Sequence, residues 1–464
     1  MTRIAPALPS PARLSAHLAA LEHQLLERQT TTRLLLLAAL AGEHVLLIGP
    51  PGTAKSELAR RLHRAFDGAR YFERLLTRFS TPEELFGPLS LKALEDDRYE
   101  RLIDGYLPTA GIAFLDEVFK ANSAILNALL TLLNEREFDN GAGRLRVPLV
   151  SVIGASNEAP IDDSLLAFHD RFLLRVPVAP VSDASFAALL TLGDAPAPAA
   201  GEPITAAERR AIAGQRDAVS LGDEALQALS ALRGLVSRHD WPVSDRRWRQ
   251  LVALLRCAAC TEGRAEVDAL DLWLAPYILS PDADAAPQLT AWVAERLVQA
   301  VPQDASWLTR AVEAFEKQLD IERQLPAEDG DDTAGKLALA RTLSGNDEQG
   351  GMTRIVSAVL EEKLRRRFSP VHVAARVAQV DEVLSRAQAA RAPVQVAHDT
   401  LQARLAGRLW LPPELADAWL GAHRHTLEVL DALLARLQHT RAGFAAMPVD
   451  EQAPAIAPAA PITE

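Results

Sequence analysis

The apolar and polar positions follow two different patterns along the chain, and the change falls near residue 193. Before it, short apolar runs typical of buried parallel strands are separated by stretches with helical spacing. The expected strands are Val45–Ile48, Arg70–Thr77, Ile112–Leu115, Leu149–Ala155 and Leu173–Val178. Because strands that alternate with helices form doubly wound parallel sheets, the sequence predicts an α/β core.

Helical spacing fills the segments between these runs. We expect one or two helices over residues 11–40, one over Glu57–Phe66 and one over Ser123–Asn134. Residues 136–148 are expected to form a β-hairpin, because Asp139-Asn-Gly favours a tight turn. The first part of the chain should therefore be a sheet covered by helices.

Strand signals almost vanish after residue 205, and the pattern becomes helical. The Pro- and Ala-rich stretch Gly193–Pro203 predicts a linker or surface loop between the two parts. The predicted domains are an α/β core over 1–192, a small helical domain over 205–280, a helical connection over 281–325, an acidic flexible segment over 326–352, a helical C-terminal module over 353–445 and a disordered tail over 446–464.

Two apolar stripes at helical spacing mark the C-terminal module. The stripes consist of Val373, Val377, Val380 and Leu384 and of Leu427, Leu430, Leu434 and Leu437. Such stripes indicate helix faces that pack against each other within one chain. Prolines interrupt helices, so breaks are expected at Pro393 and at Pro412-Pro413. The sequence therefore predicts a helical hairpin or a three-helix unit.

Composition and charge narrow the classes of function. The chain has 464 residues, 48% of them hydrophobic, which is typical of a globular protein with a sizeable core. Its net charge of −12 argues against broad electrostatic capture of nucleic acid. No secretory signal opens the sequence, and the longest apolar run, Leu34–Ala41, is too short to span a bilayer. We therefore expect a cytoplasmic protein.

The only cysteines, Cys257 and Cys260, form a C-x-x-C motif that could indicate redox or metal chemistry. They lie in a helical apolar run, with neither a second cysteine pair nor a nearby histidine. Cysteine often serves as a small buried residue, so the pair is interpreted as part of the core.

A phosphate-binding loop is the strongest chemical signal. The apolar run Val45–Ile48 leads into the loop Gly49, Pro50, Pro51, Gly52, Thr53, Ala54, Lys55 and Ser56, and a helix follows. In such a loop the backbone N–H groups surround a phosphate, the lysine reaches the β- and γ-phosphates, and the serine hydroxyl binds Mg²⁺. Ala54 departs from the usual GxxxxGK[ST] pattern, because it stands where a second glycine belongs.

Acidic and amide residues at the ends of later strands complete this chemistry. Asp116 and Glu117 follow the run Ile112–Leu115 directly. Asp116 is expected to hold Mg²⁺, and Glu117 to orient and deprotonate the attacking water. Asn157, at the end of the next strand, is expected to lie near the γ-phosphate and to position that water. The predicted ligands are therefore ATP or ADP with Mg²⁺.

The ordered set of motifs resembles the MoxR family of AAA+ ATPases, most of all its RavA-like branch. The motifs are GPPGTAKS from Gly49, FLDE from Phe114, GASNE from Gly154 and HDRF from His169. The likeness extends over residues 20–260, and an alanine before the loop lysine is common in that family. The resemblance implies a P-loop AAA+ sheet, an all-α lid formed by the 205–280 domain, and a helical C-terminal module.

The resemblance also implies roles for single residues. Asn157 matches the sensor-1 residue, and Arg171 matches the arginine finger that reaches the ATP of a neighbouring subunit. Arg246 matches the sensor-2 arginine of the lid, with Arg247 as the alternative. A finger that acts on a neighbour requires a ring, usually a hexamer. Residues 78–110 and 136–147 would be the helix-2 insert and the pre-sensor hairpin, which face the working surface of such rings.

The C-terminal part departs from the RavA-like pattern. That pattern includes a β-rich domain that binds a lysine decarboxylase, whereas residues 325–395 show helix and acidic loop. The β-rich domain is therefore expected to be absent or reduced, and binding to the decarboxylase is not expected. A partner with a von Willebrand factor A-type domain, usual for the MoxR family, is implied by the resemblance.

The function expected from these observations is ATP hydrolysis in a ring that remodels or activates client proteins in a chaperone-like way. One alternative is a nucleotide-gated scaffold that binds ATP and barely hydrolyses it. A second alternative is a nucleic-acid motor, because the hairpin carries Arg136, Arg144 and Arg146. The charge of −12 argues against this second alternative.

Overall fold

The computed structural model describes residues 7–141, 143–160, 162–193, 198–282, 284–298, 305–324 and 367–451. The chain divides into two compact units, which are described separately. Unit 1 consists of residues 1–299 and 405–417, and unit 2 consists of residues 300–404 and 418–464. The predicted acidic segment 326–352 and most of the predicted tail lie outside the described residues.

A five-stranded parallel sheet forms the centre of unit 1, in the order β2-β3-β6-β1-β7. Its strands are β1 (Val45–Ile48), β2 (Tyr71–Leu75), β3 (Ile112–Asp116), β6 (Ser151–Ser156) and β7 (Leu174–Pro177). The central strands β1, β3 and β6 are almost wholly buried, as expected for continuous apolar runs between two helical layers. The predicted α/β parallel sheet is therefore confirmed.

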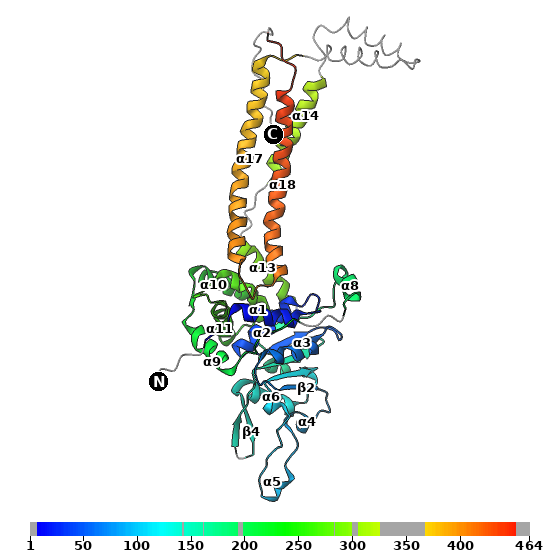
Figure 1. The fold of residues 1–464 in the computed structure, drawn as a ribbon, viewed down its shortest axis with the longest axis vertical. Helices are drawn as coiled ribbons and strands as arrows, with labels where there is room; N and C mark the ends of the chain where they lie inside the picture. Colours follow the sequence, from blue (N-terminus) through cyan, green and yellow to red (C-terminus); the bar gives the residue numbers. More distant parts are fainter. Residues whose placement is uncertain are drawn as a thin grey trace, which may run out of the picture. The chain divides into compact units, whose positions relative to one another are not determined.

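Helices cover this sheet and build the core (Figure 1). They are α1 (Pro11–Glu22), α2 (Gln29–Ala41), α3 (Lys55–Leu62), α6 (Ser123–Glu135) and α7 (Asp163–His169), with the 3-10 turns η1 (His63–Ala65) and η3 (Val118–Lys120). The helix α8 (Asp183–Leu190) follows β7 and has no buried residue. Residues 11–40 thus form two helices. The buried apolar side chains of α6 and those of the sheet share one core, so the helix is held by tertiary packing rather than by propensity.

The segment between β2 and β3 and the hairpin after α6 are joined to each other. The segment contains α4 (Pro82–Phe86), α5 (Leu91–Glu95) and η2 (Leu107–Thr109), and the hairpin consists of β4 (Glu137–Asn140) and β5 (Gly143–Arg146). The Asn140 side chain accepts from Arg101 N at 2.7 Å and donates to Arg101 O at 3.2 Å. One amide thus ties the segment to the predicted hairpin.

The helical domain that follows is also part of unit 1. Its elements are α9 (Ala206–Gln215), η4 (Arg216–Ala218), β8 (Ser220–Leu221), α10 (Asp223–Arg238), α11 (Asp245–Thr261), β9 (Glu266–Val267), η5 (Ala269–Leu274), α12 (Ala275–Leu279) and α13 (Ala285–Val298). The two short strands β8 and β9 pair in parallel, a detail that the helical pattern did not predict.

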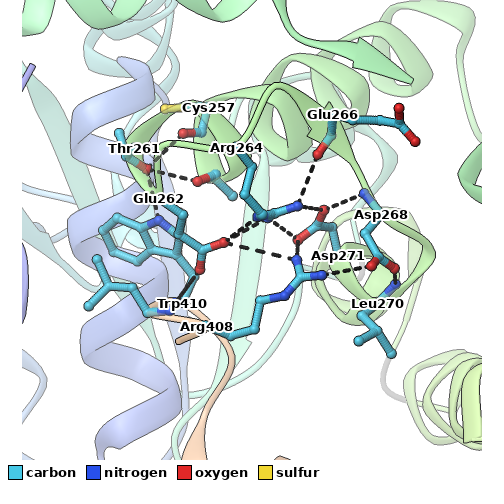
Figure 2. A network of polar contacts seen from close by, with 12 residues as sticks. Cys257, Thr261, Glu262, Arg264, Glu266, Asp268, Leu270, Asp271, Arg408 and Trp410 are labelled. Carbon is cyan, nitrogen blue, oxygen red and sulfur yellow. Dashed lines mark hydrogen bonds and ion pairs between the residues drawn. The ribbon is translucent and has the colours of Figure 1, made fainter. Parts of the chain in front are cut away.

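Residues 405–417 belong to unit 1 and bind this domain through a polar network (Figure 2). Arg408 donates to Asp271 at 3.0 Å and to Asp268 at 2.8 Å. Arg264 pairs with Glu262 and with Asp271, both at 2.7 Å. Glu262 also accepts from Leu409 N, and Trp410 Nε1 donates to Thr261 Oγ1 at 2.8 Å. We call Thr261, Glu262, Arg264, Asp268, Asp271, Arg408 and Trp410 the lid clamp.

Unit 2 is a three-helix unit built from α14 (Ser306–Gln324), α17 (Pro370–Leu405) and α18 (Pro413–Ala445) (Figure 1). The two predicted stripes both lie in its core, where Val380 and Leu437 are fully buried. Residues 353–366 of the predicted module lie outside the described residues.

The predicted break at Pro393 is wrong, because α17 continues through this residue. A proline inside a helix removes the hydrogen bond to the carbonyl of Ala389. Ala387 and Val394, on either side of that point, are nevertheless buried in the core of unit 2. Packing along the whole helix therefore outweighs the local cost. Pro413 is the first residue of α18, a position that proline favours.

No helix among the described residues is both long enough and apolar enough to cross a membrane.

Candidate functional site

The phosphate loop lies between β1 and α3, as predicted. Gly49 is required here, because a Cβ at this position would lie 2.1 Å from the carbonyl oxygen of Val178. Gly52 has a φ of +81°, and Ala54 adopts the left-handed conformation with a φ of 65°. A left-handed alanine costs about 1–2 kcal/mol. Ala54 thus keeps the backbone shape that a glycine would give, at some cost in strain.

Lys55 is the first residue of α3 and is buried. Its Nζ donates to the carbonyl oxygens of Gly49 at 2.6 Å and Pro50 at 2.8 Å. Burial lowers the pKa of Lys55, whereas the nearby carboxylates of Asp116 and Glu117 act to raise it. The lysine is therefore held over its own loop and close to the two predicted carboxylates.

β3 and β6 bring the predicted acidic and amide groups together. The two strands are neighbours in the sheet, so their carboxyl ends meet at one edge. Asn157 Nδ2 donates to Glu117 Oε1 at 2.8 Å, and Glu117 N donates to Asp116 Oδ1 at 3.0 Å. Lys120 Nζ lies 3.1 Å from Glu117 Oε1. We call this side of the sheet, with the phosphate loop, the nucleotide edge.

Glu117 has a left-handed backbone with a φ of 52°. Non-glycine residues in this region carry strain of the order of 1–3 kcal/mol and cluster at functional sites. The left-handed residue marks a sharp change of backbone direction, since Asp116 ends the strand and Glu117 is the residue before the turn η3. The adjacent residues can therefore act on different groups.

The oxygen groups at the nucleotide edge fit Mg²⁺ bound with a nucleotide. Asp116 and Ser56 offer a carboxylate and a hydroxyl, the hard oxygen ligands that this ion prefers. Among the described residues, no group of three or more His, Cys, Asp and Glu side chains could form an all-protein metal site. Mg²⁺ bound with a nucleotide usually takes only one or two carboxylates and completes its shell with phosphates and water.

Arg28 braces the phosphate loop, a role that the sequence did not reveal. This arginine between α1 and α2 is 5% exposed. Its guanidinium donates to Thr53 O at 3.3 Å and to Ala179 O at 2.7 Å, so it joins the loop to the chain after β7. A single arginine between two helices gives no sequence signal, because only the fold brings these carbonyls to it.

Arg171 lies at the opposite edge of the sheet from the phosphate loop. It follows α7 and precedes β7, so it lies at the amino ends of the parallel strands, whereas Lys55, Asp116 and Asn157 lie at or beyond the carboxyl ends. The strand β1 alone separates the two edges by roughly 13 Å. The structure therefore brings Lys55, Asp116, Glu117 and Asn157 together, but places Arg171 apart from them.

The two lid arginines at the start of α11 have different surroundings. Arg247 is 3% exposed, and each of its N–H groups donates to an oxygen of the segment 170–173 or of Ile278. Arg246 is exposed and lines a pocket of about 770 Å³ with Glu43, the second residue before β1. This pocket is at the amino ends of the strands, so neither arginine lies with Lys55 in its own subunit.

Cys257 and Cys260 are free thiols in α11, and both are buried. Burial raises the pKa of Cys257 to about 12 and also raises that of Cys260. Thiols that stay protonated are poor nucleophiles and poor metal ligands. The interpretation of the pair as core residues agrees with this environment.

Comparisons with known proteins cover most of unit 1. Residues 12–212 match the family model for the MoxR domain in the MoxR-vWA-beta-propeller ternary systems, and residues 224–293 match the AAA lid domain. The phosphate loop, Glu117, Asn157 and Arg171 lie within the first match, and Arg246 and the lid residues of the clamp lie within the second. Arg408 and Trp410 lie outside both.

Three relatives are similar to this chain in sequence. The uncharacterized protein MJ0079 of Methanocaldococcus jannaschii is 43% identical over 261 residues, which cover 56% of this chain and 68% of that protein. MJ0812 of the same organism is 42% identical over 264 residues, with 56% and 69% covered. Protein MoxR of Paracoccus denitrificans is 32% identical over 167 residues, with 34% and 48% covered. The chain belongs to the MoxR family of AAA+ ATPases.

Proposed function

We propose that this chain hydrolyses ATP at sites shared between neighbouring subunits of a ring, most simply a hexamer. The observation that carries the proposal is the division of the predicted catalytic groups between the two edges of one sheet. Lys55, Asp116, Glu117 and Asn157 share the nucleotide edge, and Arg171 lies at the other. A heterologous, head-to-tail contact would place the finger of one subunit at the nucleotide edge of the next.

Each residue then has a distinct task. The loop N–H groups and Lys55 would hold the phosphates, and Glu117 would accept a proton from the attacking water. The amide of Asn157 would orient Glu117 and that water. Mg²⁺, held by Ser56 and Asp116, would neutralise charge on the β- and γ-phosphates. The guanidinium of Arg171 would stabilise the charge on the transferred phosphoryl group, and Arg246 would face the same neighbouring site.

Replacement of the proposed base tests this assignment. Glu117→Gln keeps the size and the contact with Asn157 but cannot accept the proton, so turnover should fall by about 10²- to 10⁴-fold. The dissociation constant for ATP should change little. Phosphate release and nucleotide binding would be measured on the same preparation, with Glu382→Gln, an exposed glutamate on α17, as the control. Turnover close to wild type in Glu117→Gln would rule out the assignment.

We further propose that hydrolysis remodels or activates a client protein, as in the RavA-like branch, in the cytoplasm. The name of the matched MoxR model supports a partner with a von Willebrand factor A-type domain. The working surface would comprise α5 and the β4–β5 hairpin, where Leu91 is 76% and Leu145 is 42% exposed. Capture of a protein by the Glu117→Gln variant with ATP, and its loss with ADP, would test this proposal.

The two alternatives predict different outcomes. A nucleotide-gated scaffold would bind ATP and assemble but release no phosphate, which the same assay detects. A nucleic-acid motor would show salt-dependent binding to DNA or RNA and stimulated hydrolysis. Two of the three hairpin arginines give this alternative little support. The side chain of Arg136 is bound to the carbonyls of Leu149 and Val150, and Arg144 pairs with Glu135 and Asp139.

A further inference from the structure

One lid arginine holds the backbone on both sides of the proposed finger. Arg247 Nη1 donates to the carboxylate of Asp170 at 2.9 Å and to its carbonyl oxygen at 3.4 Å. Nη2 donates to Phe172 O at 3.2 Å and to Leu173 O at 2.8 Å. These acceptors lie immediately before and after Arg171. A single planar guanidinium therefore fixes the short segment that contains Arg171.

The same guanidinium also joins this segment to two lid helices. Arg247 lies in the first turn of α11, and its Nε donates to the carbonyl of Ile278 in α12. All five N–H groups of the side chain are thus used, and the arginine is 3% exposed. A lysine could not replace this arrangement, because an ammonium is a point charge with three donors.

The far end of α11 is held as well. Thr261 is its last residue and accepts a hydrogen bond from Trp410 of the lid clamp (Figure 2). Glu262, the next residue, accepts one from the backbone N–H of Leu409. A helix of this length extends about 25 Å, and an α-helix bends little over such a distance. Both ends of α11 are therefore tied, one to the finger segment and one to residues 405–417.

We propose that Arg247 is a positioning residue for the arginine finger, so that the lid of one subunit sets where Arg171 enters the neighbouring site. The inference rests on the proposed function, in which Arg171 acts on the neighbour's ATP. Asp170 is the second positioning residue, since its carboxylate accepts a hydrogen bond from Arg247 next to Arg171. Arg247 would then influence hydrolysis in the next subunit and not at its own phosphate loop.

Mixed rings test this direction of action. Arg247→Lys alone should lower turnover by about 100-fold, the cost of a misplacement near 1 Å, and should leave ATP binding unchanged. Glu117→Gln subunits cannot hydrolyse, but they carry an intact finger. In an equimolar mixture, about a quarter of the interfaces would combine an intact site from one variant with an intact finger from the other. Turnover should therefore rise well above that of either variant alone.

The controls separate three outcomes. Arg171→Ala mixed with Glu117→Gln should be rescued in the same way, and Arg238→Lys, an exposed lid arginine, should match wild type. Rescue of Arg171→Ala without rescue of Arg247→Lys would overturn the inference and indicate that Arg247 serves its own site. Absence of rescue for Arg171→Ala would instead contradict the shared site of the proposed function.

A second variant covers a failure of Arg247→Lys to fold, which circular dichroism would reveal. Asp170→Asn retains an oxygen acceptor beside the finger and removes the charge, so the fold should be kept while the hold on the segment weakens. Its turnover should fall by about tenfold and should recover in the mixture with Glu117→Gln. A folded Asp170→Asn with reduced turnover and no recovery would overturn the inference.

Discussion

The nucleotide edge and the lid clamp use the same kinds of charged side chain in opposite ways. At the nucleotide edge, Glu117 is 16% exposed and contacts one amide and one lysine. In the lid clamp, the side chains of Glu262 and Asp271 are 4% and 6% exposed, and two arginines bind Asp271. The first arrangement leaves donors and acceptors accessible at the edge of a sheet, and the second leaves few of them accessible.

This difference indicates where each substitution should act. A change at the nucleotide edge removes a group that can act on a ligand, and few internal contacts are lost with it. A change in the lid clamp leaves a buried charge without its partner, which costs several kcal/mol of stability. Buried pairs of this kind hold the structure, and accessible groups on a strained turn, such as Glu117, can carry chemistry.

The largest effect is expected at the phosphate loop. Lys55→Ala should lower hydrolysis by about a thousandfold, because the positive charge next to the phosphates is lost. The free energy of unfolding should change by no more than about 1–2 kcal/mol, because the loss of two hydrogen bonds to loop carbonyls is offset by removal of a charge that burial disfavours. Turnover and chemical denaturation would be measured with Lys317→Ala, an exposed lysine on α14, as the control. A strongly destabilised Lys55→Ala would remove the contrast between the two regions.

The reverse result is expected in the lid clamp. Arg408→Ala should lower the free energy of unfolding by about 3 kcal/mol, because Asp268 and Asp271 lose a buried partner. Turnover per folded subunit should stay close to that of wild type. Chemical denaturation and phosphate release at low temperature would measure both. Unchanged stability would show that Arg264 alone is enough for the buried carboxylates.

The smallest effect is expected from the buried thiol next to the clamp. Burial raises the pKa of Cys257 from 9.0 to about 12, so the folded state keeps its proton while the unfolded state loses it above pH 9. Stability that is present below pH 9 should therefore decline as the pH rises, by about 1.4 kcal/mol at pH 10. Cys257→Ala should lack this part of the decline. The free energy of unfolding would be measured for wild type and Cys257→Ala between pH 8 and 10.5. An equal decline in the two proteins would contradict this expectation.

Much of the nucleotide edge could be predicted, because its signals are local. The strand Val45–Ile48 has the bounds expected from its apolar run, and the loop and helix follow in order. Asp116 and Asn157 were placed at strand ends, and parallel strands bring such ends to one edge. Periodicity and strand order were therefore sufficient for this part.

The contacts of the arginines could not be predicted in this way. Arg28, Arg247 and Arg408 are ordinary charged residues in the sequence, and their acceptors lie many positions away. The predicted break at Pro393 was wrong for a related reason. The rule that proline interrupts a helix considers only local residues, whereas packing against distant residues stabilises α17. The structure also shows that Arg247 is buried whereas Arg246 is exposed, a difference that two adjacent positions in one motif could not reveal.

The sequence by itself determined the succession of strands along the chain, the phosphate loop and the acidic strand end, since each depends on residues close together in the chain. Only the tertiary structure decided which charged groups remain accessible and which form buried ion pairs and hydrogen bonds within the protein. That choice depends on burial and on carbonyl and carboxylate partners supplied by distant segments. For this protein it distinguishes Lys55, which lies at the phosphate loop, from Arg247, whose N–H groups are all used to hold the segment around Arg171 and the carbonyl of Ile278.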